Sequence, residues 1–515
     1  MSAAPATPER RAAAARAEPS PFLPLGPVAR LAFLFYLFAY RIVFPVFAAT
    51  VKPGAMDLFA LRFLAELFYT CLLAYPFIFY RKEYGWLHPL VLPVLWQLGK
   101  ALAKNPLSLL FPFELPQIDF AVETSSRAAV LSIPNTDLAW YRLEATLMYG
   151  LAQAAYLAMF LFGPTFKVPR WSLRRPASVA LPAMIFIGGL LGLAAVFVIA
   201  KGGFSEMLIA MRGGRRALFA GYGQYVTAAQ LAPIIALIWF AYEKKPFTNP
   251  LFIGGFVASL LTSLVVSGSR SSIILPALTF VLLWWWRRGR VMALPTMAAA
   301  LIALVIVGGF GAIRQDYGST SVDLSVFNLD QFGTTIGRAY TEIGKRDDQD
   351  STVAVMASAN RKGFLWGRSY VNAATFWVPR ALWPGKPVGV DVYNNWINFS
   401  DNKITDAPPN EGSWGIPVDG QAEAYWNFRW AGVVLVFVLL GALHATLAKA
   451  AHVYRYVPIF WVVYIYTVLN VNGTSRSVAD MFKVLALILM FALLSGIIRW
   501  GKSAKVGRAA PASAA

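Results

Sequence analysis

Residues 180–200 read ALPAMIFIGGLLGLAAVFVIA, an uninterrupted apolar run without a charged side chain. A run of 18 or more such residues is long enough to cross the hydrocarbon core of a bilayer, about 30 Å thick, as a helix. Similar runs recur along the 515-residue chain, which is 57% hydrophobic and 14% charged. Soluble domains have about 25% charged residues. Because only a helix satisfies its backbone hydrogen bonds within one such run, the sequence predicts an all-α, polytopic integral membrane protein.

The apolar segments predict about twelve transmembrane helices. Nine lie within residues 28–312 and three within residues 431–499, and a long polar stretch at 313–430 separates the two groups. Residues 1–27 are rich in Ala, Pro and Arg and are expected to form a disordered cytoplasmic tail, and residues 500–515 a second cytoplasmic tail. The predicted spans are roughly 28–50, 57–80, 88–110, 143–166, 177–200, 224–242, 250–268, 272–287, 291–312, 431–448, 454–471 and 481–499.

The basic residues set the expected orientation. A net charge of +20 would suit nucleic acid if the cations formed one patch, but they punctuate the apolar segments, so the expected partner is the lipid bilayer and not nucleic acid. With twelve spans, seven basic groups fall on one side, which the positive-inside rule assigns to the cytoplasm. These groups are Arg10/Arg11/Arg16, Arg81/Lys82, Lys167/Arg170/Arg174/Arg175, Lys244/Lys245, Arg287/Arg288/Arg290, Lys449/Arg455 and Arg499/Lys502/Lys505/Arg508.

The stretch 313–430 is the one sizeable part of the chain that does not resemble a membrane segment. It holds 13 of the 26 acidic residues and seven of the 17 tryptophans, and its density of Pro, Gly, Asn and Asp disfavours regular helix. Loops carry function when a rigid scaffold positions them. We expect this stretch to be one large outer loop before the last three helices, and to carry the functional site.

Metal and cofactor chemistry are not expected. The single cysteine, Cys71, lies in an apolar run, which leaves no cysteine cluster to bind a metal. The three histidines, His88, His444 and His452, lie in or beside predicted spans or cytoplasmic turns. The acidic cluster at residues 347–350 is interpreted as a solvated turn.

Arginines in small-residue turns are the candidate anion-binding residues. Guanidinium is a planar, permanently charged fork that matches phosphate oxygens, and neighbouring Gly or Ser leaves it accessible. Arg270 lies in SGSRSS (267–272), Arg476 in NGTSRS (472–477), and Arg212 and Arg216 in MRGGRRALFAGYG (211–223). The alternatives are an arginine extending to the membrane interface for Arg270 and an exposed basic loop for Arg212 and Arg216.

Aromatic residues and carboxylates within 313–430 complete the candidate site. Trp377, Trp383 and Arg380 lie in KGFLWGRSYVNAATFWVPRALWPGKP (362–387), a mixture that suits sugar rings attached to phosphate, although a Trp/Arg belt at the membrane interface has the same composition. The segment PPNEGSWGIPVDGQAEAYWNFRWAG (408–432) offers a further aromatic ring and three carboxylates that could act as general base or pair with arginines: Tyr425, Glu411, Asp419 and Glu423. The base role is expected for this set and not for one member.

One pair of charges lies inside a predicted span. Arg62 and Glu66 are four residues apart and therefore share one helix face, which favours a buried ion pair over a site.

These motifs together resemble a known family. GSRSS (268–272), VPRALWPGKP (378–387), GQAEAYWNFRWAG (420–432), the arginine turn before the last helix and the large late loop are similar to the Wzy-type O-antigen polymerases of bacterial surface polysaccharides. Arg212 is followed eleven positions later by Gly223, a spacing described for outer loops of that family, but no arginine of the long loop repeats it. The motifs cover mainly 200–275 and 360–480.

The resemblance implies a metal-independent, inverting glycosyltransferase in the bacterial cytoplasmic (inner) membrane, with its active site facing the periplasm. It would polymerise oligosaccharide repeat units carried on undecaprenyl pyrophosphate, and a flippase and a chain-length regulator would be its protein partners. The arginines Arg212, Arg216, Arg270, Arg380 and Arg476 would bind pyrophosphate. Glu411, Asp419 or Glu423 would be the base, and Trp377, Trp383 and Tyr425 would hold sugars.

Two other classes stay open. O-antigen ligases share the architecture but have an essential histidine in the large outer loop, and residues 313–430 contain no histidine. An exporter of lipid-linked oligosaccharide should show a repeated two-half hydropathy pattern, which is absent here.

The orientation can be tested with topology reporters. Fusions at residues 340 and 400 should report the periplasm, and fusions at 172 and 288 the cytoplasm, because the basic turns stay inside. The measurement is paired alkaline phosphatase and β-galactosidase activity at each site. A cytoplasmic signal from the long stretch would remove the polymerase interpretation.

Overall fold

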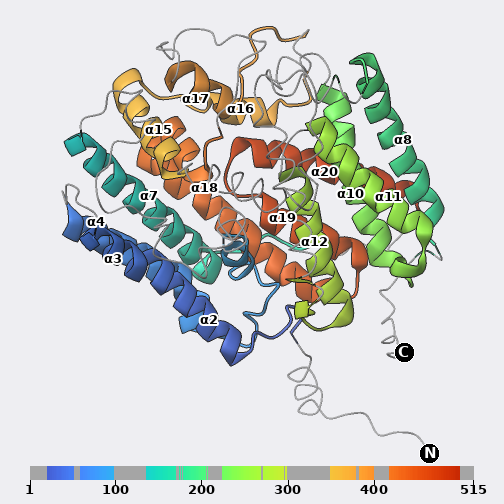
Figure 1. Ribbon diagram of the computed structural model, residues 1–515, viewed down its shortest axis with the longest axis horizontal. Coiled ribbons are helices and arrows are strands. Elements are labelled where there is room, and N and C mark those ends of the chain that lie inside the picture. The colour runs from blue at the N-terminus through green and yellow to red at the C-terminus, as the bar shows by residue number, and fades with distance from the viewer. Residues whose placement is uncertain are drawn as a thin grey trace, which may run out of the picture.

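A computed structural model describes residues 20–51, 58–97, 135–169, 178–203, 223–267, 271–294, 348–378, 382–398 and 417–498, together with residues 173, 176, 206 and 296–297. Every named element within these residues is a helix (Figure 1). The predicted all-α class is therefore confirmed for the described part of the chain. Arg212, Arg216, Arg270, Arg380 and Glu411 lie outside the described residues.

Eight helical segments of the described chain are long and apolar enough to cross a membrane, which confirms a multi-pass membrane protein. The first combines α2 (Pro27–Phe38), a π-helical turn η1 (Ala39–Val43) and α3 (Phe44–Val51). The others are α4 (Phe59–Ile78), α7 (Asn135–Phe162), α8 (Ala180–Ala200), α10 (Gly223–Tyr242), α11 (Pro250–Ser267), α18 (Gly420–Val453) and α20 (Ser475–Leu494).

The predicted number of twelve remains a prediction. The spans expected at 272–287 and 454–471 are the helices α12 (Ser271–Arg288) and α19 (Pro458–Asn470), which fall outside the eight by length or hydropathy. The spans expected at 88–110 and 291–312 lie largely outside the described residues.

Basic residues at the ends of several spans lie at one end of the helix bundle, which we call the basic end. There Lys449 Nζ donates to Thr165 Oγ1 at 3.3 Å, Arg287 donates to the Glu243 carbonyl at 2.6 Å, and the Tyr454 hydroxyl donates to the Pro169 carbonyl. These contacts join the C-terminal end of α7 to that of α18, and the C-terminal end of α10 to that of α12. The orientation of the bundle in the membrane stays a prediction.

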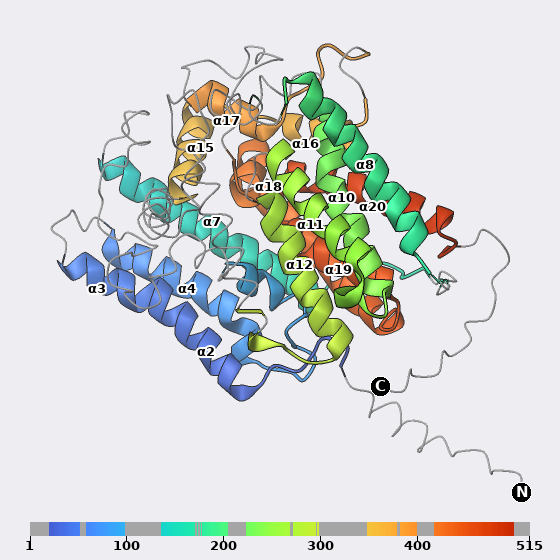
Figure 2. The same ribbon diagram turned by 45° about the vertical axis from the view of Figure 1, so that its right-hand side comes forward.

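The opposite end carries three short helices from the stretch predicted to be an outer loop. They are α15 (Asp348–Lys362), α16 (Arg368–Ala374) and α17 (Val390–Asn398), which lie together at the top of both views (Figures 1 and 2). The expectation that this stretch avoids regular helix was wrong for these segments. The apolar run Val353–Ala357 explains α15, because its side chains are buried against neighbouring helices. The acidic cluster expected in a turn includes Asp348 and Asp350, which form the first residues of α15.

Two hydrophobic clusters form the core and meet at α18. One joins α2, α4, α7, α15 and α17 with the first half of α18, and the other joins α8, α10, α12, α19 and α20. Leu440 of α18 packs against both clusters. This long helix, orange in Figure 1, therefore connects the two halves of the bundle.

Residues 20–26 are packed, although they were predicted to belong to a disordered tail. Phe22 is 1% exposed, and its carbonyl accepts a hydrogen bond from the Leu87 N–H at 3.0 Å. A Cβ at Gly85 would lie 2.1 Å from the Leu23 carbonyl oxygen, so glycine is required for this approach. The Phe22 ring contacts the rings of His88 and His452, with centroids 5.0 and 5.6 Å apart, at the basic end.

A buried ion pair lies within the spans, and the predicted carboxylate, Glu66, also has a cation from another helix as its partner. Arg41, in the π-helical turn, approaches Glu66 Oε1 to 2.5 Å and also covers the Tyr69 ring at 4.7 Å. Arg62 adds a second positive charge near the same carboxylate. Sequence spacing within one helix could identify Arg62 but not a partner on another helix.

Close packing of α18 on α7 can be tested at Gly441. A Cβ there would lie 2.5 Å from the Tyr156 carbonyl oxygen and 3.1 Å from Met159 Cβ. Gly441→Ala should lower the stability by about 1–3 kcal/mol, because the two helices must separate. Thermal unfolding in detergent measures this effect. Gly254→Ala is the control, since a Cβ there meets nothing within 4 Å, and equal melting temperatures for the two variants would contradict the packing.

Candidate functional site

The described candidate residues lie on α18, α20 and the segment that follows α16. Asp419 precedes α18, and Glu423 and Tyr425 lie in its first turns. Arg476 lies in the first turn of α20. Trp377 and Trp383 follow α16.

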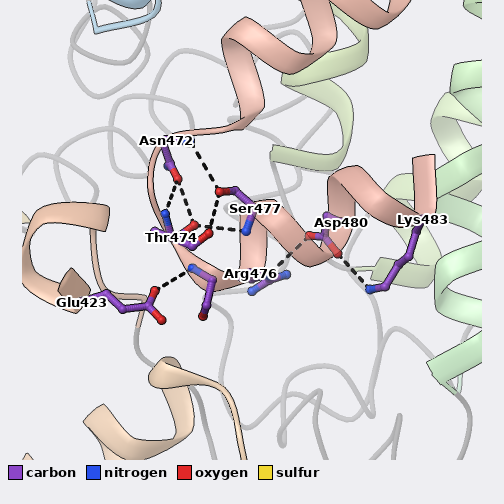
Figure 3. A network of polar contacts seen from close by, with 8 residues as sticks. Glu423, Asn472, Thr474, Arg476, Ser477, Asp480 and Lys483 are labelled. Atoms are coloured by element: carbon purple, nitrogen blue, oxygen red, sulfur yellow. Dashed lines mark hydrogen bonds and ion pairs between the residues drawn. The ribbon is translucent and has the colours of Figure 1, made fainter. Parts of the chain in front are cut away.

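The N-termini of α18 and α20 meet directly. The Ser475 N–H donates to Glu423 Oε2 at 3.0 Å, as Figure 3 shows. A Cβ at Gly420 would lie 2.2 Å from the Asn472 carbonyl oxygen, so only glycine allows the first turn of α18 to approach the turn before α20 this closely. The positive N-terminal end of α20 therefore faces a carboxylate of the chain itself.

The turn NGTSRS at 472–477 is a capping structure. Thr474 Oγ1 accepts from the Ser477 N–H at 3.1 Å, and Asn472 Oδ1 accepts from the Thr474 N–H at 3.2 Å. The Ser477 hydroxyl donates to the Thr474 carbonyl at 2.8 Å (Figure 3). The small polar residues that suggested an anion site therefore cap the N-terminus of α20. The Arg476 side chain itself is 66% exposed.

Glu423 is fully buried, and one of its two carboxylate oxygens lacks a hydrogen-bond partner among the described residues. Its exposed fraction is 0%, and Oε1 has no hydrogen-bond partner among the described residues. The side chains of Ser369 and Ser475 lie beside this carboxylate. Asn427 of α18 donates to Ser369 Oγ of α16 at 2.8 Å and so joins these two helices. A buried carboxylate oxygen without a donor is suited to accept a hydrogen bond or a proton from a ligand hydroxyl.

Asp419 has a different environment, because donors surround it. Its Oδ1 accepts from the Ala422 N–H at 2.7 Å, which caps α18. Its Oδ2 accepts from Thr352 Oγ1 at 2.7 Å and from the Tyr149 hydroxyl. These contacts join α7, α15 and α18. A carboxylate whose two oxygens accept three hydrogen bonds from the chain holds these elements together, so the geometry assigns Asp419 a structural role.

The aromatic candidates divide by exposure. The exposed fraction is 70% for Trp377 and 38% for Trp383, so both rings have free surface. Tyr425 is 3% exposed, and its hydroxyl donates to Asn360 Oδ1 at 3.3 Å. Tyr425 therefore packs within the protein, whereas the two tryptophans can contact a ligand.

Helix α18 bends directly after these residues. Phe428 and Arg429 leave helical geometry, and Arg429 has φ 57° and ψ −150°, a conformation that favours glycine. The segment before α16 supports the bend, since the Leu365 N–H donates to the Trp426 carbonyl and the Gly367 N–H to Asn427 Oδ1, both at 2.9 Å. The bend lies close to residue 431, where the tenth span was predicted to begin.

Tyr370 of α16 closes one side of the site. Its hydroxyl donates to the Gly473 carbonyl at 3.4 Å, and its ring stacks on Phe428 with centroids 6.4 Å apart. Burial, and secondarily the nearby Glu423 carboxylate, raises the pKa of Tyr370, so the phenol stays a neutral donor. Sequence reasoning placed Tyr370 among the aromatic residues of 362–387 but missed Tyr149 and Thr352, because each of these two acts through a partner distant in sequence. Among the described residues, no group of three His, Cys, Asp or Glu side chains could hold a metal ion.

The cap at Asp419 gives a stability prediction. Asp419→Ala should destabilise the protein by about 1–3 kcal/mol, because the Tyr149 and Thr352 hydroxyls lose a shared acceptor in a buried place. Asp419→Ser should recover part of the loss by capping α18. Melting temperature in detergent is the readout. Indistinguishable melting of the Ala variant and the wild type would show that the cap has no structural role.

Glu423, Arg476 and the exposed tryptophans remain as the candidate residues within the described chain. Residues on either side of Arg270 end α11 and begin α12 at the end of the bundle opposite to the basic end. A scan against protein-family models, a search of curated proteins and a search of solved structures gave no match.

Proposed function

We propose that the chain is a membrane glycosyltransferase that polymerises undecaprenyl-pyrophosphate-linked oligosaccharide repeat units into a surface polysaccharide at the periplasmic face. The growing glycan on its lipid would be the donor and one lipid-linked repeat unit the acceptor. The observation that carries the proposal is the half-used, buried carboxylate of Glu423, bonded to the same first turn of α20 that presents the exposed Arg476.

Glu423 is the preferred general base. It would accept the proton of the acceptor hydroxyl as that oxygen attacks the anomeric carbon of the donor sugar. The hydrogen bond from Ser475 fixes one carboxylate oxygen, and the buried Oε1, which has no hydrogen-bond partner among the described residues, would accept the proton. Asp419 is a poorer choice because its oxygens already accept three hydrogen bonds.

Arginines would bind the leaving group. As the new C–O bond forms, the bond from the anomeric carbon to the pyrophosphate oxygen breaks, and the pyrophosphate leaves with the electron pair. Positively charged groups held near that oxygen stabilise the developing charge without a metal. Arg476 is the described candidate, and Arg212, Arg216, Arg270 and Arg380 are further candidates outside the described residues. Attack opposite the leaving group inverts the anomeric centre.

The exposed tryptophans fit a role in sugar binding. Trp377 follows Phe376, which lies beside α20 with its ring 6.4 Å from that of Phe482. An exposed indole suits a sugar, because the apolar face of the sugar can stack on the ring. Tyr425 is better explained by packing against Trp430.

The alternative of an O-antigen ligase has less support. That family uses a histidine in the large outer loop, and the three histidines of this chain are His88, His444 and His452. His88 and His452 contact Phe22, and His444 Nδ1 lies 2.9 Å from the Tyr156 hydroxyl. These contacts engage all three side chains away from the stretch 313–430. A transporter of lipid-linked oligosaccharide would not require a buried base.

Substitutions at Glu423 and Arg476 test the proposal. Glu423→Gln keeps the shape and the acceptor for Ser475 but removes the base, and should reduce polymerisation by about 10²–10⁴-fold. Arg476→Ala should reduce it by about 10²–10³-fold, and Arg476→Lys should restore only part, because ammonium cannot form the bidentate fork. The readout is glycan chain length on gels together with protein abundance in membranes.

Glu243→Gln and Arg290→Ala are matched controls at the basic end and should give normal ladders. Full-length glycan from both Glu423→Gln and Arg476→Ala would refute the assigned roles. Transfer of single repeat units without a ladder in these variants would favour polymerase over ligase.

A further inference from the structure

Helix α20 carries three charged side chains on one face of a candidate membrane span. Arg476, Asp480 and Lys483 are spaced by four and three residues, which places them in one row. Asp480 Oδ2 lies 3.8 Å from Arg476 Nε, and Asp480 Oδ1 lies 2.9 Å from Lys483 Nζ. Figure 3 shows the carboxylate between the two cations.

The row has one positive charge in excess. Within the part of the chain that the structure describes, Asp480 is the ion-pair partner of both Arg476 and Lys483. The side chains of Asp480 and Lys483 are 33% and 31% exposed, so an added ligand can reach them. Charges within a membrane span are costly, and they persist mostly where they serve a substrate or an ion.

The surroundings of Lys483 are apolar. Its Nζ lies 5.8 Å from the centre of the Phe376 ring, which stacks on Phe482 with an interplanar angle of 14°. About two helical turns further along the same face, Met490 is 47% exposed. A ligand at this row would therefore meet charge at the start of α20 and apolar surface further into the span. This is the polarity of a lipid with an anionic headgroup.

We infer that Arg476 and Lys483 bind one phosphate group of a lipid, and that Asp480 is the internal anion that this phosphate displaces. A phosphate ester offers several oxygens and up to two negative charges, so it neutralises the row better than one carboxylate does. Arg476 supplies a fork and Lys483 a compact point charge. That the lipid is a polyprenyl carrier rests on the proposed function; the phosphate chemistry does not.

Substitutions of the anion Asp480 and of the cation Lys483 should have opposite effects on the binding of a phosphate lipid. Asp480→Asn removes the competing anion and keeps the shape of the side chain. It should tighten phosphate-lipid binding by up to about fivefold, because a partly exposed ion pair changes an equilibrium constant by about this factor. Lys483→Gln should weaken binding by a similar factor or more, and Lys483→Arg should retain it. A merely structural Asp480 would give the reverse result, because its loss would loosen the row and weaken binding.

Binding is measured on the full-length protein in detergent by native mass spectrometry, with undecaprenyl phosphate as the probe. Undecaprenol tests the lipid tail alone, inorganic phosphate tests the free anion, and phosphatidylglycerol tests an ordinary anionic lipid. Lys244→Gln, at the basic end, is the matched control and should bind as the wild type does. Melting temperature verifies that each variant is folded.

The expected result is tighter binding by Asp480→Asn, weaker binding by Lys483→Gln and no comparable binding of undecaprenol. Equal binding of phosphatidylglycerol and undecaprenyl phosphate, with the same variant pattern, would support the phosphate site and identify phospholipid as its source. Weaker binding by both variants, or equal binding of undecaprenol, would overturn the inference. A failure of polymerisation by the wild-type protein would count against the proposed function alone, since this assay contains no reaction.

Discussion

The hydrogen bond from the Ser475 N–H to the Glu423 carboxylate is the contact on which the candidate site depends. A helix N-terminus carries roughly half a positive charge, and here that of α20 ends on a carboxylate from the first turn of α18. The bond forms because Gly420 lets the two backbones touch. It places a buried acid and an exposed guanidinium in neighbouring turns of two helices separated by about fifty residues in sequence.

The sequence predicted the helices well and their ends less well. Hydropathy locates the apolar part of a helix, whereas caps and tertiary contacts decide where it begins. The apolar run of α18 begins near 431, directly after the break at Phe428 and Arg429. A further helical segment that starts at Gly420 precedes the break, because Asp419 caps it and Tyr149 and Thr352 hold the cap. Helix α7 likewise starts at Asn135, ahead of the predicted residue 143. The periodicity of a sequence cannot predict hydrogen bonds between residues so far apart in the chain.

The candidate site was partly predictable for the same reason. Residue chemistry selected Glu423 and Arg476, but it could not separate Glu423 from Asp419, because both precede the same apolar run. Their hydrogen bonds distinguish them. The Asp419 carboxylate accepts three hydrogen bonds, whereas one oxygen of the Glu423 carboxylate has no donor among the described residues. Residue chemistry also selected Tyr425 for sugars, whereas burial against Asn360 and Trp430 gives that ring a packing role. Asp480 and Lys483 were overlooked because they lie inside an apolar helix.

The bend in α18 has a mechanical consequence. A straight α18 would relieve the unfavourable backbone of Arg429, but it would break the bonds from Leu365 to Trp426 and from Gly367 to Asn427. The Phe428 ring also rests against Gly367, where a Cβ would approach it to 2.9 Å. The first two turns of α18 are therefore held to α16 and the segment before it, on one side of the break at Arg429. A displacement of α16 has to break these bonds or carry with it the turns that hold Glu423.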